Sequence, residues 1–289
     1  MPRPGQREGI MLCYPFDLRR FEKWGRRAYI QYKLNGERCR AICVGGQVKL
    51  YSSETNLVQF LPHVNEALKK LELDSVELDG ELYHHGTSLQ DIHSIVSRKV
   101  NPHEEAALVE YHIFDVIDTS LTQRERFTML SIIDKAIKRC GVEEELKIVW
   151  PELVTSEQQI DSFLDQAISE GYEGFVLRHP ENLYVRKRST NLMKYKPHQE
   201  DVYEIVGVQE EVSITGTPKN SLGAFICRGD DGTLFNVGSG PTQENRKELW
   251  RDRDSLIGKH LKVKYQALSP GKRIPLHSVA LNVLDLRSK

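Results

Sequence analysis

The sequence predicts an α+β protein in which a domain of antiparallel sheets with flanking helices is followed by a smaller, β-rich domain. Two observations support this. Strand-like and helix-like segments alternate as far as about residue 198, and from residue 201 the segments become short, β-rich and separated by turn residues. With 289 residues, of which 39% are hydrophobic, the chain can bury a core in each domain. We place the domains at 1–198 and 199–289.

The first domain begins with strand-like segments. Residues 28 to 51 contain AYIQYK, CRAICV and QVKLYS, separated by the turn-prone NGE and GG, which predicts antiparallel strands. A helix is expected in PHVNEALKKLEL, whose Val64, Leu68 and Leu71 share one side. A strand is then expected in SVELDGELYHH, broken at Asp79-Gly80.

Two further strand and helix pairs complete this domain. ALVEYHIFDVID has the length and composition of a strand, and it precedes a helix, LTQRERFTMLSIIDKAIKRCG, that closes on Gly141 as its C-cap. In IDSFLDQAISEGYEGFVLRHP an apolar helical stripe leads through a glycine turn into the strand GFVLR.

The second domain is predicted to be a small barrel. Five segments follow one another in about 90 residues: VYEIVGVQE, LGAFICR, TLFNVG, HLKVKYQAL and SVALNVLD. Five short strands with turn signals between them suit an OB-fold.

Composition excludes several classes of protein. Forty Lys and Arg against 41 Asp and Glu give a net charge of -1, which excludes a uniformly basic nucleic-acid binder but not a local basic face. Five cysteines without a CxxC pair indicate neither a disulfide framework nor a zinc site. No segment resembles a signal peptide or reaches the roughly 20 apolar residues of a membrane span. We expect a soluble cytoplasmic protein, in the host cytoplasm if its source is a virus.

Positive charge is concentrated in one window. LYVRKRSTNLMKYKPH, residues 183 to 198, carries five basic residues and no acid: Arg186, Lys187, Arg188, Lys194 and Lys196. A solvated basic loop is one interpretation. The interleaved Tyr184, Met193 and Tyr195 favour contact with a polyanion instead. In the second domain Lys262 and Lys264 form either a DNA-facing stripe or a plain barrel exterior.

Candidate chemistry centres on Lys33. The hexapeptide Lys-Leu-Asn-Gly-Glu-Arg, residues 33 to 38, puts a lysine at a strand end, before a glycine that permits a close turn. Such a lysine is a nucleophile only if burial or neighbouring cations lower its pKa, and otherwise it is a surface residue of a hairpin turn. Carboxylates that could hold Mg²⁺ or a ribose hydroxyl occur in Glu77-Leu-Asp-Gly-Glu81 and at Glu173. Phe114 could stack on a base or fill the core.

In this order, the segments resemble the motifs of the covalent nucleotidyltransferase superfamily, which contains ATP-dependent DNA ligases, RNA ligases and capping enzymes. KLNGER is similar to motif I, ELDGEL to motif III, YHIFDV to motif IIIa, EGFVLR to motif IV and LMKYKP to motif V. The tail from DVYEIVGV is similar to the OB domain of DNA ligases. Five ordered motifs are far more specific than one. The chain most resembles the small single-subunit ligases of viruses and bacteria.

The resemblance implies a nucleotidyltransferase (adenylation) domain and a role for each matching residue. Lys33 would attack the α-phosphate of ATP and become lysyl-AMP. AMP would then pass to the 5′-phosphate of a nick in duplex DNA, and attack by the 3′-hydroxyl would seal the nick. Arg38 and Glu81 would hold the ribose, and Phe114 would stack on adenine opposite the strand bearing Gln31 and Tyr32. Glu173, and less strongly Asp79, would bind Mg²⁺ or Mn²⁺. Lys194 and Lys196 would neutralise the phosphate. A monomer is expected.

Two motifs depart from the family pattern. The motif Ia position, Tyr51-Ser-Ser-Glu54, has no arginine, so the 5′-phosphate would fall to Arg40 or the basic window. Motif VI is also absent, because Arg273-Ile-Pro leads into apolar residues; Arg287 and Lys289 are the candidate substitutes. Three alternatives share most of these features: an RNA ligase, a capping guanylyltransferase and a non-catalytic nucleic-acid binder.

Overall fold

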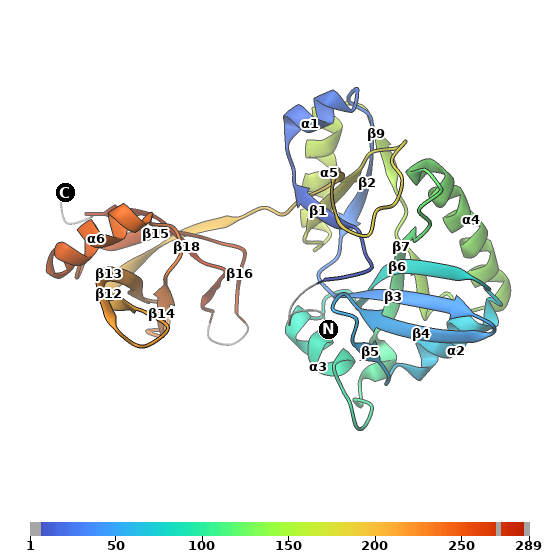
Figure 1. Cartoon of the computed structure of the whole chain (residues 1–289), viewed down its shortest axis with the longest axis horizontal. Coiled ribbons are helices and arrows are strands. Elements are labelled where there is room, and N and C mark those ends of the chain that lie inside the picture. Colours follow the sequence, from blue (N-terminus) through green and yellow to red (C-terminus); the bar gives the residue numbers. More distant parts are fainter. Residues whose placement is uncertain (1–6, 270–272, 286–289) are drawn as a thin grey trace. The chain divides into compact units, whose positions relative to one another are not determined.

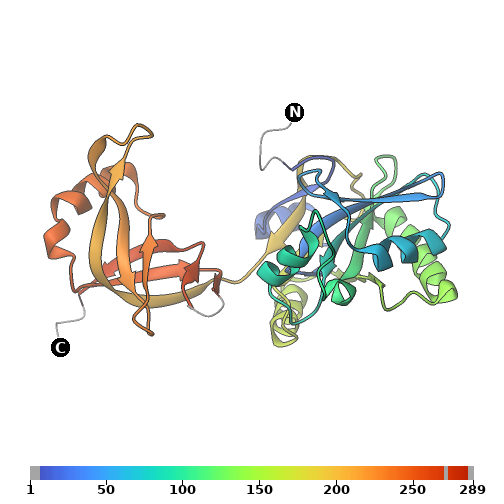
Figure 2. The ribbon, with the colours of Figure 1, turned by 90° about the horizontal axis from the view of Figure 1, so that it is seen from below.

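The computed structural model describes residues 7–269 and 273–285. The chain forms two compact units, Met1–Lys196 and Pro197–Lys289 (Figures 1 and 2). We call them the N-terminal and C-terminal units. No helix among the described residues is long and apolar enough to cross a membrane.

A six-stranded sheet forms one half of the N-terminal unit. Its order is β5-β4-β3-β6-β7-β8, antiparallel except for the parallel pair β7 and β8. The strands are β3 (Glu37–Val44), β4 (Gln47–Ser52), β5 (Leu57–Val58), β6 (Val76–Tyr83), β7 (Glu110–Val116) and β8 (Leu146–Ile148). Three helices pack their apolar sides into the same core: α2 (Pro62–Lys70), α3 (Leu89–Val96) and α4 (Gln123–Cys140).

A five-stranded sheet forms the other half of this unit. Its order is β1-β11-β10-β2-β9, in which β1 and β11 are parallel. The strands are β1 (Leu12–Pro15), β2 (Ala28–Lys33), β9 (Glu152–Val154), β10 (Gly174–Arg178) and β11 (Arg188–Tyr195). Helices α1 (Leu18–Lys23) and α5 (Glu157–Ser169) cover it, with Phe21 and Phe163 in its core.

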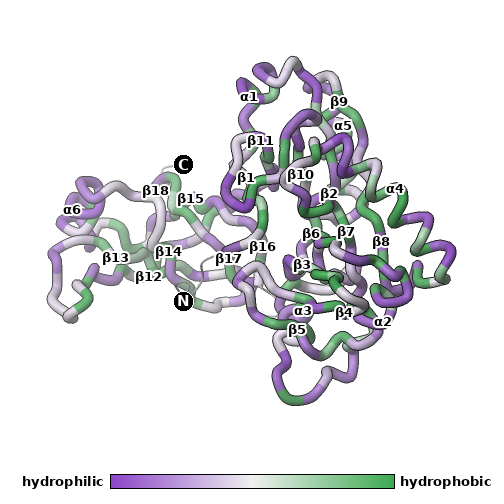
Figure 3. Tube along the Cα trace, turned by 45° about the vertical axis from the view of Figure 1, so that its right-hand side comes forward, coloured by the Kyte–Doolittle hydropathy of each residue, from purple (hydrophilic) through white to green (hydrophobic). Residues whose placement is uncertain are grey.

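The C-terminal unit is built on a five-stranded sheet of order β14-β13-β12-β15-β18. Its strands are β12 (Gln199–Val212), β13 (Pro218–Arg228), β14 (Leu234–Val237), β15 (His260–Tyr265) and β18 (Val279–Leu284), beside the short pair β16 (Ala267–Leu268) and β17 (Pro275–Leu276). A parallel bridge between Ser239 and Val279 connects the chain after β14 to β18. Helix α6 (Gln243–Arg251) has no buried residue and is mostly hydrophilic in Figure 3.

The α+β class and most expected elements are confirmed. Helix α4 begins with a capping box between Thr122 and Glu125, and it ends at Gly141, whose φ of 63° is the left-handed conformation that glycine adopts most readily. One expectation is wrong: β6 is not broken at Asp79-Gly80. The strand continues, and only its register with β7 shifts there, because a bulge absorbs the irregularity.

A buried ionic cluster joins the two sheets of the N-terminal unit. Asp115, on β7 of the six-stranded sheet, accepts hydrogen bonds from Arg126 of α4 at 2.8 Å and from Arg178, on β10 of the other sheet, at 2.8 Å. Arg178 also donates to Gln31 of β2 at 2.6 Å, and Gln123 accepts from Arg126 at 2.7 Å. Asp115 and Arg126 are fully buried. One carboxylate therefore compensates two guanidinium groups away from water.

The cluster predicts a large stability effect at one position. Asp115→Asn removes the only carboxylate that the described structure pairs with Arg126 and Arg178. Because two buried cations are then left without their counter-charge, the free energy of unfolding should fall by about 3 to 5 kcal/mol. Urea unfolding followed by the fluorescence of Trp24 and Trp150, both in this unit, measures it. The matched control is Asp134→Asn, which removes only the partly exposed pair with Lys138 and should cost about 0.5 kcal/mol or less. Equal destabilisation of the two variants would contradict the assignment.

Candidate active site

A pocket of about 300 Å³ lies between the two sheets of the N-terminal unit. The five-stranded sheet contributes Lys33 at the end of β2, Glu173 just before β10 and Lys194 of β11. The six-stranded sheet contributes Arg38 of β3, Glu81 of β6 and Phe114 of β7. Figure 3 labels the six strands that carry or adjoin these residues: β2, β10, β11, β3, β6 and β7. The pocket therefore brings together residues from five of the sequence motifs.

Lys33 and Lys196 share one carboxylate. β2 and β10 pair so that Lys33 lies opposite Gly174, and the Glu173 backbone N–H donates to the Lys33 carbonyl at 3.0 Å. This register brings the Glu173 side chain to the Lys33 ammonium through one oxygen and to the Lys196 ammonium through the other. The Glu173 side chain is 10% exposed, so this ion-pair triad is largely shielded from water.

The surroundings of Lys33 favour its unprotonated form. Burial lowers the pKa of Lys33 to about 8, and the nearby charges of Lys194 and Lys196 act in the same direction, whereas Glu81 opposes them. Burial also lowers the pKa of Lys196. A lysine whose pKa is close to neutral pH is a competent nucleophile, so the hairpin-turn interpretation of Lys33 does not describe its environment.

Arg38 and Asp79 form a buried pair at the side of the pocket. Arg38 donates to both oxygens of Asp79, at 2.7 and 2.6 Å, and Tyr184 donates to the second oxygen at 2.7 Å. Asp79 is fully buried, and both of its oxygens are occupied by these donors. The geometry favours a positioning role for Asp79, holding Arg38, over the metal role expected from the sequence.

Glu81 interacts electrostatically with Lys33. Burial raises the pKa of Glu81 to about 7, although Lys33, Arg38 and the Gly36 N–H all act to lower it. The Gly36 N–H donates to Glu81 at 3.3 Å. A Cβ at position 36 would come within 2.3 Å of the Leu82 carbonyl oxygen, so this turn accepts only glycine without rearrangement.

Two arginines contact the Phe114 ring. The guanidinium carbon of Arg38 is 4.9 Å from the centre of that ring, and that of Arg178 is 5.3 Å away. Gln31 is buried: it donates to the Phe114 carbonyl at 3.2 Å and to the Val149 carbonyl at 2.6 Å, and it accepts from Arg178. The side chain of Gln31 therefore fixes the backbone behind the ring. Arg178 was missed by the sequence analysis, because only the fold brings its guanidinium to Phe114.

Tyr32 lines the pocket, but its ring packs in an aromatic cluster. Successive residues of a strand point to opposite faces, and the Tyr32 ring stacks on Tyr172 with centroids 4.1 Å apart and lies 4.8 Å from Phe163. Its hydroxyl accepts from Gln166 at 3.0 Å. The packing of Tyr32 thus supports the strand on the side away from Lys33.

The basic residues expected to bind DNA fall into three places. Arg40 and Arg186 both pair with Glu77, at 3.5 and 2.9 Å, while Arg188 lines the pocket and contacts the Cys13 carbonyl. Lys187 is exposed. Lys262 and Lys264 alternate with buried residues on β15 of the C-terminal unit, and Lys262 pairs with Glu200 at 2.7 Å. The motif VI candidates Arg287 and Lys289 lie outside the described residues.

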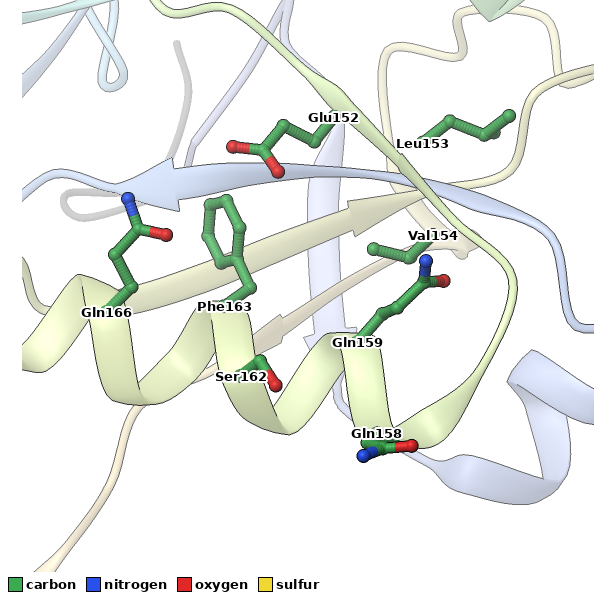
Figure 4. A pocket seen from close by; sticks show the side chains of 8 residues that line it. All are labelled: Glu152, Leu153, Val154, Gln158, Gln159, Ser162, Phe163 and Gln166. Carbon is green, nitrogen blue, oxygen red and sulfur yellow. The ribbon is translucent and has the colours of Figure 1, made fainter.

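A second pocket, of about 400 Å³, has a different chemistry. It lies between α5 and β9, where the side chains of Gln158, Gln159, Ser162 and Gln166 line one side (Figure 4). Among the described residues that line it, Glu152 alone is ionisable. Amides and one carboxylate provide no nucleophile with a lowered pKa, so this pocket is not a candidate for the same chemistry.

Two family models match this chain, in the order that the sequence motifs predict. The model described as "ATP dependent DNA ligase domain" matches residues 10–196, and the model described as "DNA ligase OB-like domain" matches residues 215–279. The second match lies within the C-terminal unit, which confirms the expected OB-like fold.

Individual relatives are DNA ligases. One from Archaeoglobus fulgidus is 28% identical over 246 residues, covering 78% of this chain and 42% of its own length. One from African swine fever virus (strain Badajoz 1971 Vero-adapted) is 28% identical over 283 residues, covering 89% of this chain and 65% of its own length. The chain thus spans about two fifths of the length of the archaeal relative.

Solved structures share the fold. The structure described as "DNA binding with a minimal scaffold: Structure-function analysis of Lig E DNA ligases" superposes with a TM-score of 0.76 at 20% identity, covering 95% of this chain and 98% of that one. "Pmar-Lig_PreS3" gives 0.79 at 21% identity, covering 95% and 67%. Because the first family model matches more than half of its residues, this chain belongs to the ATP-dependent DNA ligase family.

Proposed function

We propose that this chain uses ATP to seal nicks between a 3′-hydroxyl and a 5′-phosphate in duplex DNA. The observation that carries the proposal is the position of Lys33, which lies largely buried, near Lys194 and Lys196, in a pocket that also holds an aromatic ring and carboxylates. The family match supports the choice of ATP and of DNA as substrates.

The first step is a transfer of AMP to Lys33. The unprotonated Nζ attacks the α-phosphate, a P–N bond forms, and the bond to the β-phosphate oxygen breaks, so that pyrophosphate leaves with the electron pair. Negative charge gathers on the phosphate in the transition state. Lys194 and Lys196 are the cations placed to stabilise that charge, since both lie close enough to Lys33 to lower its pKa.

Nucleoside binding falls to the other sheet. Phe114 presents a ring held in place by Arg38 and Arg178, which suits stacking on adenine. Glu81 and Arg38 are placed to hold the ribose, and Asp79 orients Arg38. Gln31 acts indirectly, by fixing the backbone of Phe114.

Glu173 fits a divalent metal ion. Its two carboxylate oxygens are hard ligands of the kind that Mg²⁺ and Mn²⁺ prefer, and in this structure they bind ammonium groups instead. A bound divalent cation would supply charge neutralisation at the phosphates. With Glu173 holding the ion, the ammonium form of Lys33 would lose a stabilising contact.

The remaining steps need a nicked duplex. We expect Arg188, which lines the pocket, to meet the 5′-phosphate. Arg40, Arg186, Lys187, Lys262 and Lys264 would contact other phosphates of the duplex. AMP transfers to the 5′-phosphate, and attack by the 3′-hydroxyl then forms the phosphodiester bond and releases AMP. Both sheets of the pocket come from one chain, which supports action as a monomer.

We also infer a reducing compartment, such as the cytoplasm. All five cysteines are free, and Cys39, Cys43 and Cys227 are buried. Unpaired thiols of this kind are typical of proteins that are not exposed to oxidising conditions.

The pH dependence of the first step follows from the surroundings of Lys33. Because burial, and to a smaller extent the neighbouring cations, disfavour the ammonium form, the single-turnover rate of AMP transfer should rise with pH and reach half its plateau near pH 8. Lys194→Ala removes a cation, so the Lys33 pKa rises and the midpoint moves to higher pH. The control is Lys138→Ala, an exposed lysine of α4 outside the pocket, which should leave the midpoint in place. A Lys194→Ala midpoint unchanged or moved to lower pH would contradict the electrostatic account.

Nick sealing tests the proposed reaction. With Mg²⁺ and ATP, the protein should convert a labelled nicked DNA duplex to the continuous strand, and Lys33→Ala or EDTA should reduce sealing to the level without protein. Lys138→Ala is again the control and should seal normally. GTP in place of ATP, and a nicked RNA duplex in place of DNA, should give little product. A preference for GTP would indicate a capping enzyme, and a preference for RNA an RNA ligase.

A further inference from the structure

Outside the pocket, the described structure has a second concentration of positive charge on and after α1. The segment Asp17–Arg27 carries five basic residues against two acids: Arg19, Arg20, Lys23, Arg26 and Arg27. It was not part of the basic window found in the sequence, and none of its residues takes part in the reaction described above.

Packing fixes the direction in which α1 presents these charges. Phe21 is fully buried, and Leu18 and Trp24 pack against the same core beneath the five-stranded sheet. These three residues are spaced three apart, so they lie on one side of the helix and anchor it. Arg19 and Lys23 are exposed, as are Arg26 and Arg27 in the following turn. The buried side chains therefore fix the rotation of α1 about its axis, and its charged side faces solvent.

Within residues 7–269 and 273–285, four of these five cations form no ion pair. Among the described residues, Arg26 is the one member of the set in an ion pair, with Glu22 at 2.8 Å, and both partners are largely exposed. The acid at the start of the helix, Asp17, caps it by accepting from the Arg19 backbone N–H at 3.0 Å. An uncompensated group of arginines and lysines is suited to a polyanion.

A tyrosine connects this surface to the pocket. The guanidinium carbon of Arg20 lies 5.3 Å from the centre of the Tyr14 ring, and that of Arg188 lies 5.6 Å from the same ring. Tyr14 is part of β1, which leads directly into α1 (Figure 1), and Arg188 lines the pocket. Positive charge thus continues from the pocket, through the two arginines on Tyr14, to the exposed side of α1.

We propose that Arg19, Lys23 and Arg27, continued by Arg20, form a docking surface for the phosphate backbone of duplex DNA beyond the nick. The proposal rests on the proposed function, because it takes the duplex at the pocket as given. A nick phosphate at Arg188 is followed by further phosphates along the strand, and Arg20 shares the Tyr14 ring with Arg188. The contact is with backbone and not with base edges, so it binds duplexes of any sequence.

The test compares two variants with the same change in net charge. One is the triple variant Arg19→Ala, Lys23→Ala and Arg27→Ala. The matched control is Lys135→Ala, Lys138→Ala and Arg139→Ala, which removes three exposed cations from α4 in the same unit. Binding to a fluorescein-labelled nicked duplex is measured by anisotropy, in EDTA to prevent turnover, at several NaCl concentrations between about 50 and 200 mM.

At the lowest salt concentration, the α1 variant should bind the nicked duplex at least about 10-fold more weakly than the wild type. Its plot of log affinity against log salt concentration should have a slope that is shallower by about 0.9 for each phosphate that the protein no longer neutralises. The control should keep the wild-type slope. Lys33 adenylation should be equal in all three proteins, which separates this inference from the proposed function. If the α1 variant kept the affinity and the salt slope of the wild type, the proposal would be overturned, and an acidic protein would become the expected partner of this surface. If the two variants bound DNA equally weakly, the proposal would also be overturned, because the loss would then be a general effect of net charge.

Discussion

The structure of the N-terminal unit depends on one carboxylate, Asp115, that ties its two sheets together. Each sheet alone presents half of a site: Lys33 and Glu173 on one, Arg38, Glu81 and Phe114 on the other. Asp115 reaches across from β7 to Arg178 of β10, and the same guanidinium lies against the Phe114 ring. The ion pair between Asp115 and Arg178 therefore both connects the two sheets and holds the guanidinium that contacts the Phe114 ring. The same interaction contributes to the stability of the unit and to the geometry of the pocket.

Burial has a second consequence, for the reactivity of Lys33. Desolvation and the neighbouring lysines favour the neutral amine, whereas the direct contact with Glu173 favours the ammonium. The protonation of Lys33 therefore depends on two carboxylates, Glu173 in direct contact and Glu81 nearby. A chain with almost no net charge can therefore hold a strongly cationic site, because its positive charge is concentrated where phosphate would bind.

Much of this arrangement could be predicted from the sequence, and the exceptions have a physical explanation. Motif order predicted that Lys33, Glu173 and Phe114 belong to one site, and all three line the pocket. Lys33 and Glu173 leave a local signal because they lie at a strand end and beside a glycine turn. The role of Arg178 left no such signal, since its partner Asp115 is 63 residues away in the sequence and lies on the other sheet. Arg126 is only 11 residues from Asp115, but no motif indicated that the two side chains form a buried pair. For Asp79 the sequence motif was less informative than the fold. The motif indicated a metal ligand, but Arg38 and Tyr184 donate hydrogen bonds to its two oxygens.

The central claim, that Lys33 is the residue that accepts AMP, is tested most directly by mapping the adduct. The protein is incubated with Mg²⁺ and ATP labelled at the α-phosphate, and then digested and analysed by mass spectrometry. The account predicts one acid-labile AMP for each chain, on the peptide containing Lys33, and no label in Lys33→Ala. Absence of the adduct, its presence on another residue, or undiminished labelling of Lys33→Ala would contradict it.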